Sequence, residues 1–195
     1  YDATKQTAAT ATLAEGGNGV ENAVGGMPFP LPKSGVEVIW NHMLRFRGEI
    51  AVRWVGQAAP TRGGQYTLVQ FDEETIFLYH LPNMAADALR NRILLFKQAV
   101  TAPARLAGGI LLVHETMNQI KQPRDAWLYN PGQRRVRRAP QVAYDNPGTA
   151  SDNMRTSDQL DMFNGAPDRY DWKLVGKKEI YVPYPLAKFG RHSLE

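Results

Sequence analysis

The residue types that carry most enzymatic chemistry are scarce in this 195-residue chain. It has no cysteine, which removes thiol nucleophiles, disulfides and cysteine-ligated metals together. No serine lies in a G-x-S-x-G sequence. His114 and Glu115 are followed by Asn118, where the H-E-x-x-H zinc motif needs a second histidine. The sequence therefore predicts no catalytic residue, no metal site and no cofactor.

Carboxylates occur in two clusters, Asp72-Glu73-Glu74 and Asp158 with Asp161. Either cluster could bind a cation, but a turn at the first and a helix start at the second explain them equally well. Paired carboxylates for hydrolysis depend on a separation in space that the sequence does not give. The two clusters carry no prediction of catalysis.

A basic cluster dominates the charge pattern. The net charge is +4, and residues 121–138 contain six basic side chains against the single acid Asp125. Its core is Arg134, Arg135, Arg137 and Arg138, which could contact an anionic membrane surface or an acidic partner. Neighbouring Trp127 and Tyr129 could stack on bases, but nucleic acid is not an expected partner, because no reader motif is present. A solvated edge strand protected from aggregation explains the same pattern.

Large aromatic side chains at alternating strand positions are the other candidate functional residues. On one face of a strongly curved sheet they would either fill a core or line a cavity for an apolar guest. Together with a helical tryptophan, the candidates for lining such a cavity are Trp40, Trp54, Phe77, Tyr79, Phe96, Trp127, Tyr170 and Trp172.

One clearly marked helix is predicted, and it carries Trp40, one of the candidate lining residues. Residues 1–32 are rich in alanine, threonine, glycine and proline, and predict an irregular lead-in. Ser34 and Glu37 then form a capping box, and apolar residues recur at helical spacing up to Gly48. This pattern predicts a helix over 35–47 with Trp40 on its apolar face.

Strands follow the helix. Ile50, Val52 and Trp54 alternate with Glu49, Ala51 and Arg53, which is typical of a half-buried strand. Further strands are predicted over 66–71 and 76–81, with a turn at 72–74 between them, and over 92–100 and 109–117. Residues 85–91 fit a helix or a loop.

Pro131-Gly132 predicts a type II turn that pairs Tyr129 with Arg134 and Trp127 with Val136. Near the end of the chain, the pattern predicts a short helix over 157–163 and a hairpin over 170–182. The sum is an α+β fold in which a curved antiparallel sheet, an incomplete barrel, has the helix packed on its concave face. We expect one domain over 33–192, and residues 193–195 have the composition of a cloning scar.

Several segments resemble a known family: Pro28–Gly35, Trp40-Asn41-His42, Pro103–Gly109, Trp127–Pro131 and Tyr170–Leu174. They resemble the bacterial family catalogued as domain of unknown function 1329, over about residues 20–184. The hairpin sequence W-L-Y-N-P-x-x-R-R-V-R-R, followed by Ser157-Asp158, is also similar to the outer-membrane lipoprotein-sorting proteins LolA and LolB. In those relatives an incomplete antiparallel barrel closed by helices shields acyl chains in the periplasm.

The resemblance implies that architecture and a periplasmic location, and transfers no specific binding residue. It implies a non-catalytic carrier or accessory protein whose partner is a lipid, a lipoprotein or another hydrophobic ligand. The alternative is an interaction domain with a filled core, serving an envelope complex or transporter. A second alternative is a nucleic-acid-binding module that uses the basic hairpin at 121–138.

Overall fold

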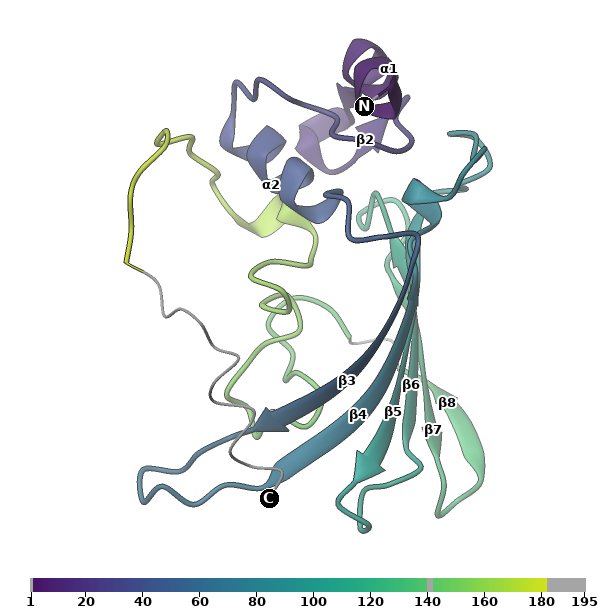
Figure 1. The fold of residues 1–195 in the computed structure, drawn as a ribbon, viewed down its shortest axis with the longest axis vertical. Coiled ribbons are helices and arrows are strands. Elements are labelled where there is room, and N and C mark those ends of the chain that lie inside the picture. Colours follow the sequence, from purple (N-terminus) through teal and green to yellow (C-terminus); the bar gives the residue numbers. More distant parts are fainter. Residues whose placement is uncertain (1, 140–141, 182–195) are drawn as a thin grey trace.

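The computed structural model describes residues 2–139 and 142–181. Its main feature is a six-stranded antiparallel sheet in which every strand pairs with its neighbour in the chain. The sheet is strongly curved and open, with β3 at one edge and β8 at the other, so it is not a closed barrel (Figure 1). Its strands are β3 (Ile50–Ala58), β4 (Leu68–Ile76), β5 (Arg92–Ala102), β6 (Ile110–Thr116), β7 (Asp125–Asn130) and β8 (Arg135–Arg138).

The predicted capped helix is present as α2 (Gly35–Met43) and ends four residues earlier than expected. The Ser34 hydroxyl accepts a hydrogen bond from the Glu37 amide at 3.3 Å, and the Glu37 carboxylate accepts one from the Lys33 amide at 2.5 Å. The first bond satisfies one of the amide donors that every helix start leaves free, and the second joins the Glu37 carboxylate to the residue before the cap. Trp40 is 1% exposed, as the helical spacing predicts.

The position of α2 corrects the expectation that a helix covers the concave face. The helix lies at one end of the sheet (Figure 1). There Trp40, Met43 and Leu44 pack with Tyr79 and Ile93 in the larger apolar core. The Trp40 indole also donates a hydrogen bond to the Gly17 carbonyl at 2.9 Å. We call this region the helical end.

Residues 2–32 are more ordered than their composition predicts. They form helix α1 (Asp2–Thr10), the 3₁₀ turn η1 (Glu15–Gly17), and a small hairpin of β1 (Thr12–Leu13) and β2 (Val20–Glu21). Val20 and Ala23 belong to the core of the helical end. The expected irregular lead-in is therefore part of the folded unit.

Several predicted elements differ in the structure. Strand β4 runs straight through residues 72–74, because each pairs with a residue on both neighbouring strands. The chain then forms the 3₁₀ turn η2 (Leu78–His80) in place of a strand over 76–81. Residues 157–163 form turns rather than a helix, and the described part of the predicted final hairpin, residues 170–181, contains no strand.

The arginine hairpin forms with a different register. Asn130 pairs with Arg135 and Tyr129 with Val136, so the loop is two residues longer than the predicted turn. Arg134 lies in that loop with a φ of 50°. Trp127, Tyr129 and Val136 still share a face, but Val136 lies opposite Tyr129, where Arg134 was predicted, and Arg138 lies opposite Trp127, where Val136 was predicted.

The concave face of the sheet is covered by residues 142–165, which we call the covering segment. In Figure 1 this segment, in green, runs along the inside of the curve. On this face Val142 packs against a second small core of Leu111, Val113 and Ala126. An irregular segment therefore does what the helix was expected to do.

Candidate functional site

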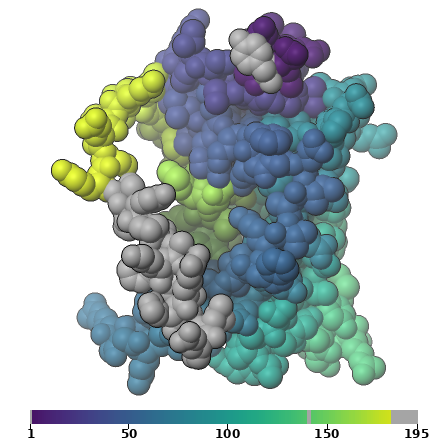
Figure 2. Space-filling view, viewed as in Figure 1, coloured from purple at the N-terminus to yellow at the C-terminus, as the bar shows by residue number. Residues whose placement is uncertain are grey.

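A cavity of about 300 Å³ lies between the concave face and the covering segment. In the space-filling view, the green atoms of this segment are recessed beside the blue atoms of α2, β3 and β4 (Figure 2). The sheet forms one wall, because alternate residues of β3, β4, β5 and β6 point inward. The apolar part of this wall is Val55, Phe71, Phe96, Leu111 and Val113, and Val142 of the covering segment packs against Leu111 and Val113.

Glu73 adds a charged group to this wall. Arg53, Glu73 and Gln98 are cross-strand neighbours on β3, β4 and β5. The Glu73 carboxylate lies 3.1 Å from the Arg53 guanidinium and accepts a 2.8 Å hydrogen bond from the Gln98 amide. The side chain of Glu73 is only 8% exposed, and these two contacts satisfy both of its carboxylate oxygens.

A second polar group joins the sheet to the covering segment. Glu115 lies 3.1 Å from the Arg124 guanidinium and accepts hydrogen bonds from Gln119 at 2.8 Å and Asn164 at 3.2 Å. Arg124 in turn donates to the Asn164 carbonyl at 2.7 Å. Burial raises the pKa of Glu115, while Arg124 opposes that rise. We call this set the Glu115 network.

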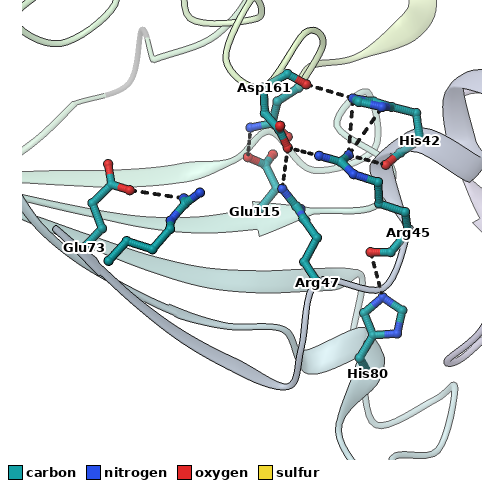
Figure 3. Close-up of polar contacts among 9 residues, drawn as sticks. His42, Arg45, Arg47, Glu73, His80, Glu115 and Asp161 are labelled. Atoms are coloured by element: carbon teal, nitrogen blue, oxygen red, sulfur yellow. Dashed lines mark hydrogen bonds and ion pairs between the residues drawn. The ribbon is translucent and has the colours of Figure 1, made fainter. Parts of the chain in front are cut away.

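A third group, the Asp161 cluster, lies between the end of α2 and the covering segment (Figure 3). The Asp161 carboxylate accepts from Arg45 at 2.5 Å and from Arg47 at 2.6 Å. The Asp161 carbonyl lies 2.9 Å from a ring nitrogen of His42. Burial lowers the pKa of Arg47, and Asp161 opposes that shift. The cluster fastens the covering segment beside one end of the cavity.

Arg155 is the fourth arginine of the cavity lining. Its guanidinium has only long contacts, to the Gln57 side-chain oxygen at 3.4 Å and the Thr156 carbonyl at 3.5 Å. Within residues 2–139 and 142–181, no carboxylate forms a salt bridge with it. Burial lowers the pKa of Arg155.

The structure brings two of the eight predicted lining residues into the cavity, Phe77 and Phe96. Trp40 and Tyr79 lie in the core of the helical end. Tyr170 and Trp172 pack around Phe163 in the C-terminal part of the described chain. The remaining two, Trp54 and Trp127, lie on the convex face of the sheet.

Strand β3 shows why the predicted aromatic residues do not share one face of the sheet. Its alternation is present, but Arg53, Val55 and Gln57 point into the cavity. Ile50, Val52 and Trp54 point outward, and Trp54 is 84% exposed. A period of two defines two faces without saying which one is covered.

None of the predicted basic contact residues lines the cavity. Arg135, Arg137 and Arg138 form the edge strand β8 and are exposed. Arg138 pairs with Asp125, and Arg137 donates a hydrogen bond to Gln133 at 2.9 Å. The cluster is therefore a separate surface of the molecule.

Sequence reasoning placed none of the charged residues of the cavity lining in such a cavity, namely Arg47, Arg53, Glu73, Glu115, Arg124, Arg155 and Asp161. A usable signal existed for Glu73 and Glu115, because each lies on the same side of its strand as inward-facing apolar neighbours such as Phe71 and Val113. A charged residue at a core position of a strand needs a partner, and therefore marks a polar contact inside the fold. Arg155 and Asp161 lie in turns and carried no such signal.

The lining of the cavity combines apolar and charged side chains. Among the described residues, no group of three or more His, Asp or Glu side chains is placed to hold a metal ion. The same part of the chain contains no helix with the length and apolar character needed to span a bilayer. An apolar wall combined with a few fixed charges suits an amphipathic guest.

Comparisons with known proteins place the chain among proteins without an assigned activity. A family model described as "Protein of unknown function (DUF1329)" matches residues 1–195. The uncharacterized protein PA3922 of Pseudomonas aeruginosa is 60% identical over 187 residues, which cover 96% of this chain and 41% of that protein. A crystal structure of a DUF1329 family protein from Desulfovibrio piger is similar with a TM-score of 0.50 and 21% identity, over 69% of this chain and 50% of that one. The chain thus spans less than half the length of this curated relative.

Proposed function

Since the chain belongs to the DUF1329 family, whose description names no activity, we propose from its cavity that it is a non-catalytic carrier or accessory protein for a hydrophobic ligand. The observation that carries the proposal is the cavity of about 300 Å³ between the concave face and the covering segment. This volume is at the lower end of the range for small-molecule sites, roughly 300–1,000 Å³.

Apolar burial would provide most of the binding free energy. Each methylene group moved from water to the apolar wall contributes about 0.8 kcal/mol. The charged groups at the cavity edges would keep one end of the guest in a polar environment, as in other small-molecule sites with few polar groups.

The similarity to LolA and LolB extends this proposal. It adds a LolA/LolB-like fold, a periplasmic location, and a lipid or lipoprotein as the hydrophobic partner. The open, curved antiparallel sheet is compatible with that fold. Fractionation of cells that produce the full-length protein tests the location, and recovery in the cytosolic fraction would remove it from the proposal.

The direct test is binding of N-phenyl-1-naphthylamine, an uncharged fluorescent probe, to protein purified without detergent. Leu111 faces the cavity and Leu112 faces the opposite side of the same strand. We expect Leu111→Trp to fill the cavity and weaken probe binding at least tenfold, whereas Leu112→Trp leaves it within twofold. The proposal would be contradicted if the wild type bound no probe and native mass spectrometry found no co-purifying lipid.

The convex side of β3 favours a second candidate, an interaction domain serving an envelope complex. Ile50, Val52 and Trp54 form an exposed apolar row on this edge strand. Exposed apolar rows and unpaired strand edges are features of protein contact sites. If Trp54→Ala abolishes capture of an envelope protein while both leucine variants bind the probe equally, this candidate replaces the first.

A further inference from the structure

We infer that the guest of this cavity carries an oxyanion head group, a carboxylate or a phosphate, which Arg155 receives. The inference rests on the proposed function and adds the chemical class of the ligand. It starts from the contrast between Arg155 and the other arginines that line the same cavity.

Those other three arginines each have a carboxylate partner. Arg47 pairs with Asp161 at 2.6 Å, Arg53 with Glu73 at 3.1 Å and Arg124 with Glu115 at 3.1 Å. Within the described chain Arg155 has no such partner, and its two hydrogen bonds are at the long end of the usual range. Among the described residues, Arg155 is therefore the one guanidinium of the lining that forms no salt bridge.

A partly desolvated charge without a partner costs free energy that a bound counter-ion recovers. Glu73 is the acidic group whose charge reaches Arg155. Both of its oxygens are already engaged, by Arg53 and by Gln98. Because a guanidinium binds carboxylate and phosphate oxygens through two parallel N–H groups, an oxyanion fits this position.

The turn that carries Arg155 is also tied to the sheet before any ligand arrives. A Cβ at Gly148 would lie 2.8 Å from the Arg155 Cζ, so the guanidinium rests where only glycine leaves room. The Gly148 amide donates to the Arg155 carbonyl at 2.8 Å. Gln57 donates to the carbonyls of Thr149 and Ala150 and so ties this turn to β3. Such preorganisation reduces the entropy lost on binding.

The rest of the cavity sets the kind of molecule. Phe96, Leu111 and Val113 belong to the same lining as Arg155, so one guest could use the charge and the apolar wall together. The volume of about 300 Å³ suits a single short chain rather than a two-chain lipid. The geometry thus describes an amphiphile with one oxyanion head and one short apolar tail.

The experiment compares four ten-carbon probes below their micellar concentrations: decanoate, decyl phosphate, 1-decanol and decylamine. Displacement of N-phenyl-1-naphthylamine gives their relative affinities. We expect decanoate, decyl phosphate or both to bind at least tenfold more tightly than 1-decanol, and decylamine no more tightly than 1-decanol. The order of the two anions identifies whether a carboxylate or a phosphate is the better head group.

Arg155→Gln should remove this preference, and a circular dichroism spectrum equal to that of the wild type shows that the variant is folded. Arg155→Lys keeps the charge and should retain part of the preference. Arg62→Gln, the same change at an exposed turn, should retain all of it.

Equal binding of all four probes by the wild type would overturn the inference, as would a preference for the anions that survives in Arg155→Gln. Both results leave the proposed function intact. Failure of the wild type to bind N-phenyl-1-naphthylamine or any decyl probe removes the proposed function itself, so the two failures are distinguishable.

Discussion

The helical end and the concave face bury side chains in different ways. At the helical end, Trp40, Leu44 and Tyr79 are almost fully buried in an apolar core closed by α2 and the N-terminal residues. On the concave face, the apolar wall is interrupted by ion pairs, and a cavity remains. The first region is a filled apolar core, whereas the second keeps charged groups and open space inside the fold.

The two regions also differ in how much free energy their buried groups contribute to stability. A filled apolar core gains free energy from every buried side chain. Buried ion pairs such as Glu115–Arg124 barely repay their desolvation, so they add little stability but penalise any arrangement that separates them. We therefore expect the concave face to contribute less to the free energy of unfolding than the helical end does.

Trp40→Ala is the largest expected perturbation of the helical end. Removal of this buried indole and of its bond to Gly17 should lower the free energy of unfolding by about 3–5 kcal/mol. Urea denaturation followed by circular dichroism measures the change. Trp54→Ala is the matched control, because its exposed indole should cost less than about 0.5 kcal/mol. Equal losses for the two variants would contradict the assignment of the core.

Arg124→Met tests the buried charges of the concave face. It leaves the Glu115 carboxylate buried without its counter-charge and should cost about 3 kcal/mol at neutral pH. The double variant Glu115→Met/Arg124→Met removes both charges and should recover most of this loss. If the double variant is as unstable as Arg124→Met, an uncompensated carboxylate is not the cause.

The same variant makes a prediction about pH. Burial raises the folded-state pKa of Glu115 above the ordinary value of 4.5, and the loss of Arg124 raises it further. A carboxyl with a raised folded pKa gives stability that is present below its unfolded pKa and lost as pH rises through the folded pKa. The deficit of Arg124→Met relative to the wild type should therefore grow as the pH rises from the folded pKa of Glu115 in the wild type, which lies above 4.5, towards its still higher folded pKa in the variant. A pH-independent deficit would exclude this explanation.

Asp161→Asn should have a smaller effect, confined to the covering segment. It weakens two partly exposed ion pairs, with Arg45 and Arg47, at a cost of about 1 kcal/mol. Hydrogen exchange should accelerate in residues 142–165 and stay unchanged in α2. The control is Asp145→Asn, which removes only a long, exposed contact with Arg169. Faster exchange throughout the core would show that Asp161 does more than fasten this segment.

The double reversal Arg135→Glu/Arg137→Glu should have the smallest effect. Both side chains are exposed on the edge strand β8, so the free energy of unfolding should change by less than about 0.5 kcal/mol. We also expect unchanged sedimentation with anionic vesicles, which is the result for a solvated edge strand. Loss of vesicle binding would instead show a membrane contact, since each basic residue contributes about 1 kcal/mol there.

The sequence predicted those elements that are stabilised by interactions between residues close together in the chain. Ser34 and Glu37 were enough to predict where α2 begins, because the capping bonds join neighbours in the chain. Strands β5 and β6 and the arginine hairpin were also predicted, since their alternation and turn residues lie in one stretch of sequence. Family membership followed from the same local segments.

Which side chains face the cavity was decided by the tertiary structure alone. The alternation of β3 was correct, yet Arg53 and Gln57 face the cavity and Trp54 faces outward, because the side of a strand that is buried depends on what covers it. The covering segment has no regular period and could not be placed from its residues. Asp161 and Arg155 became part of the site only when this segment crossed the sheet, since Arg45 and Gln57, which contact them there, lie 116 and 98 positions earlier in the chain.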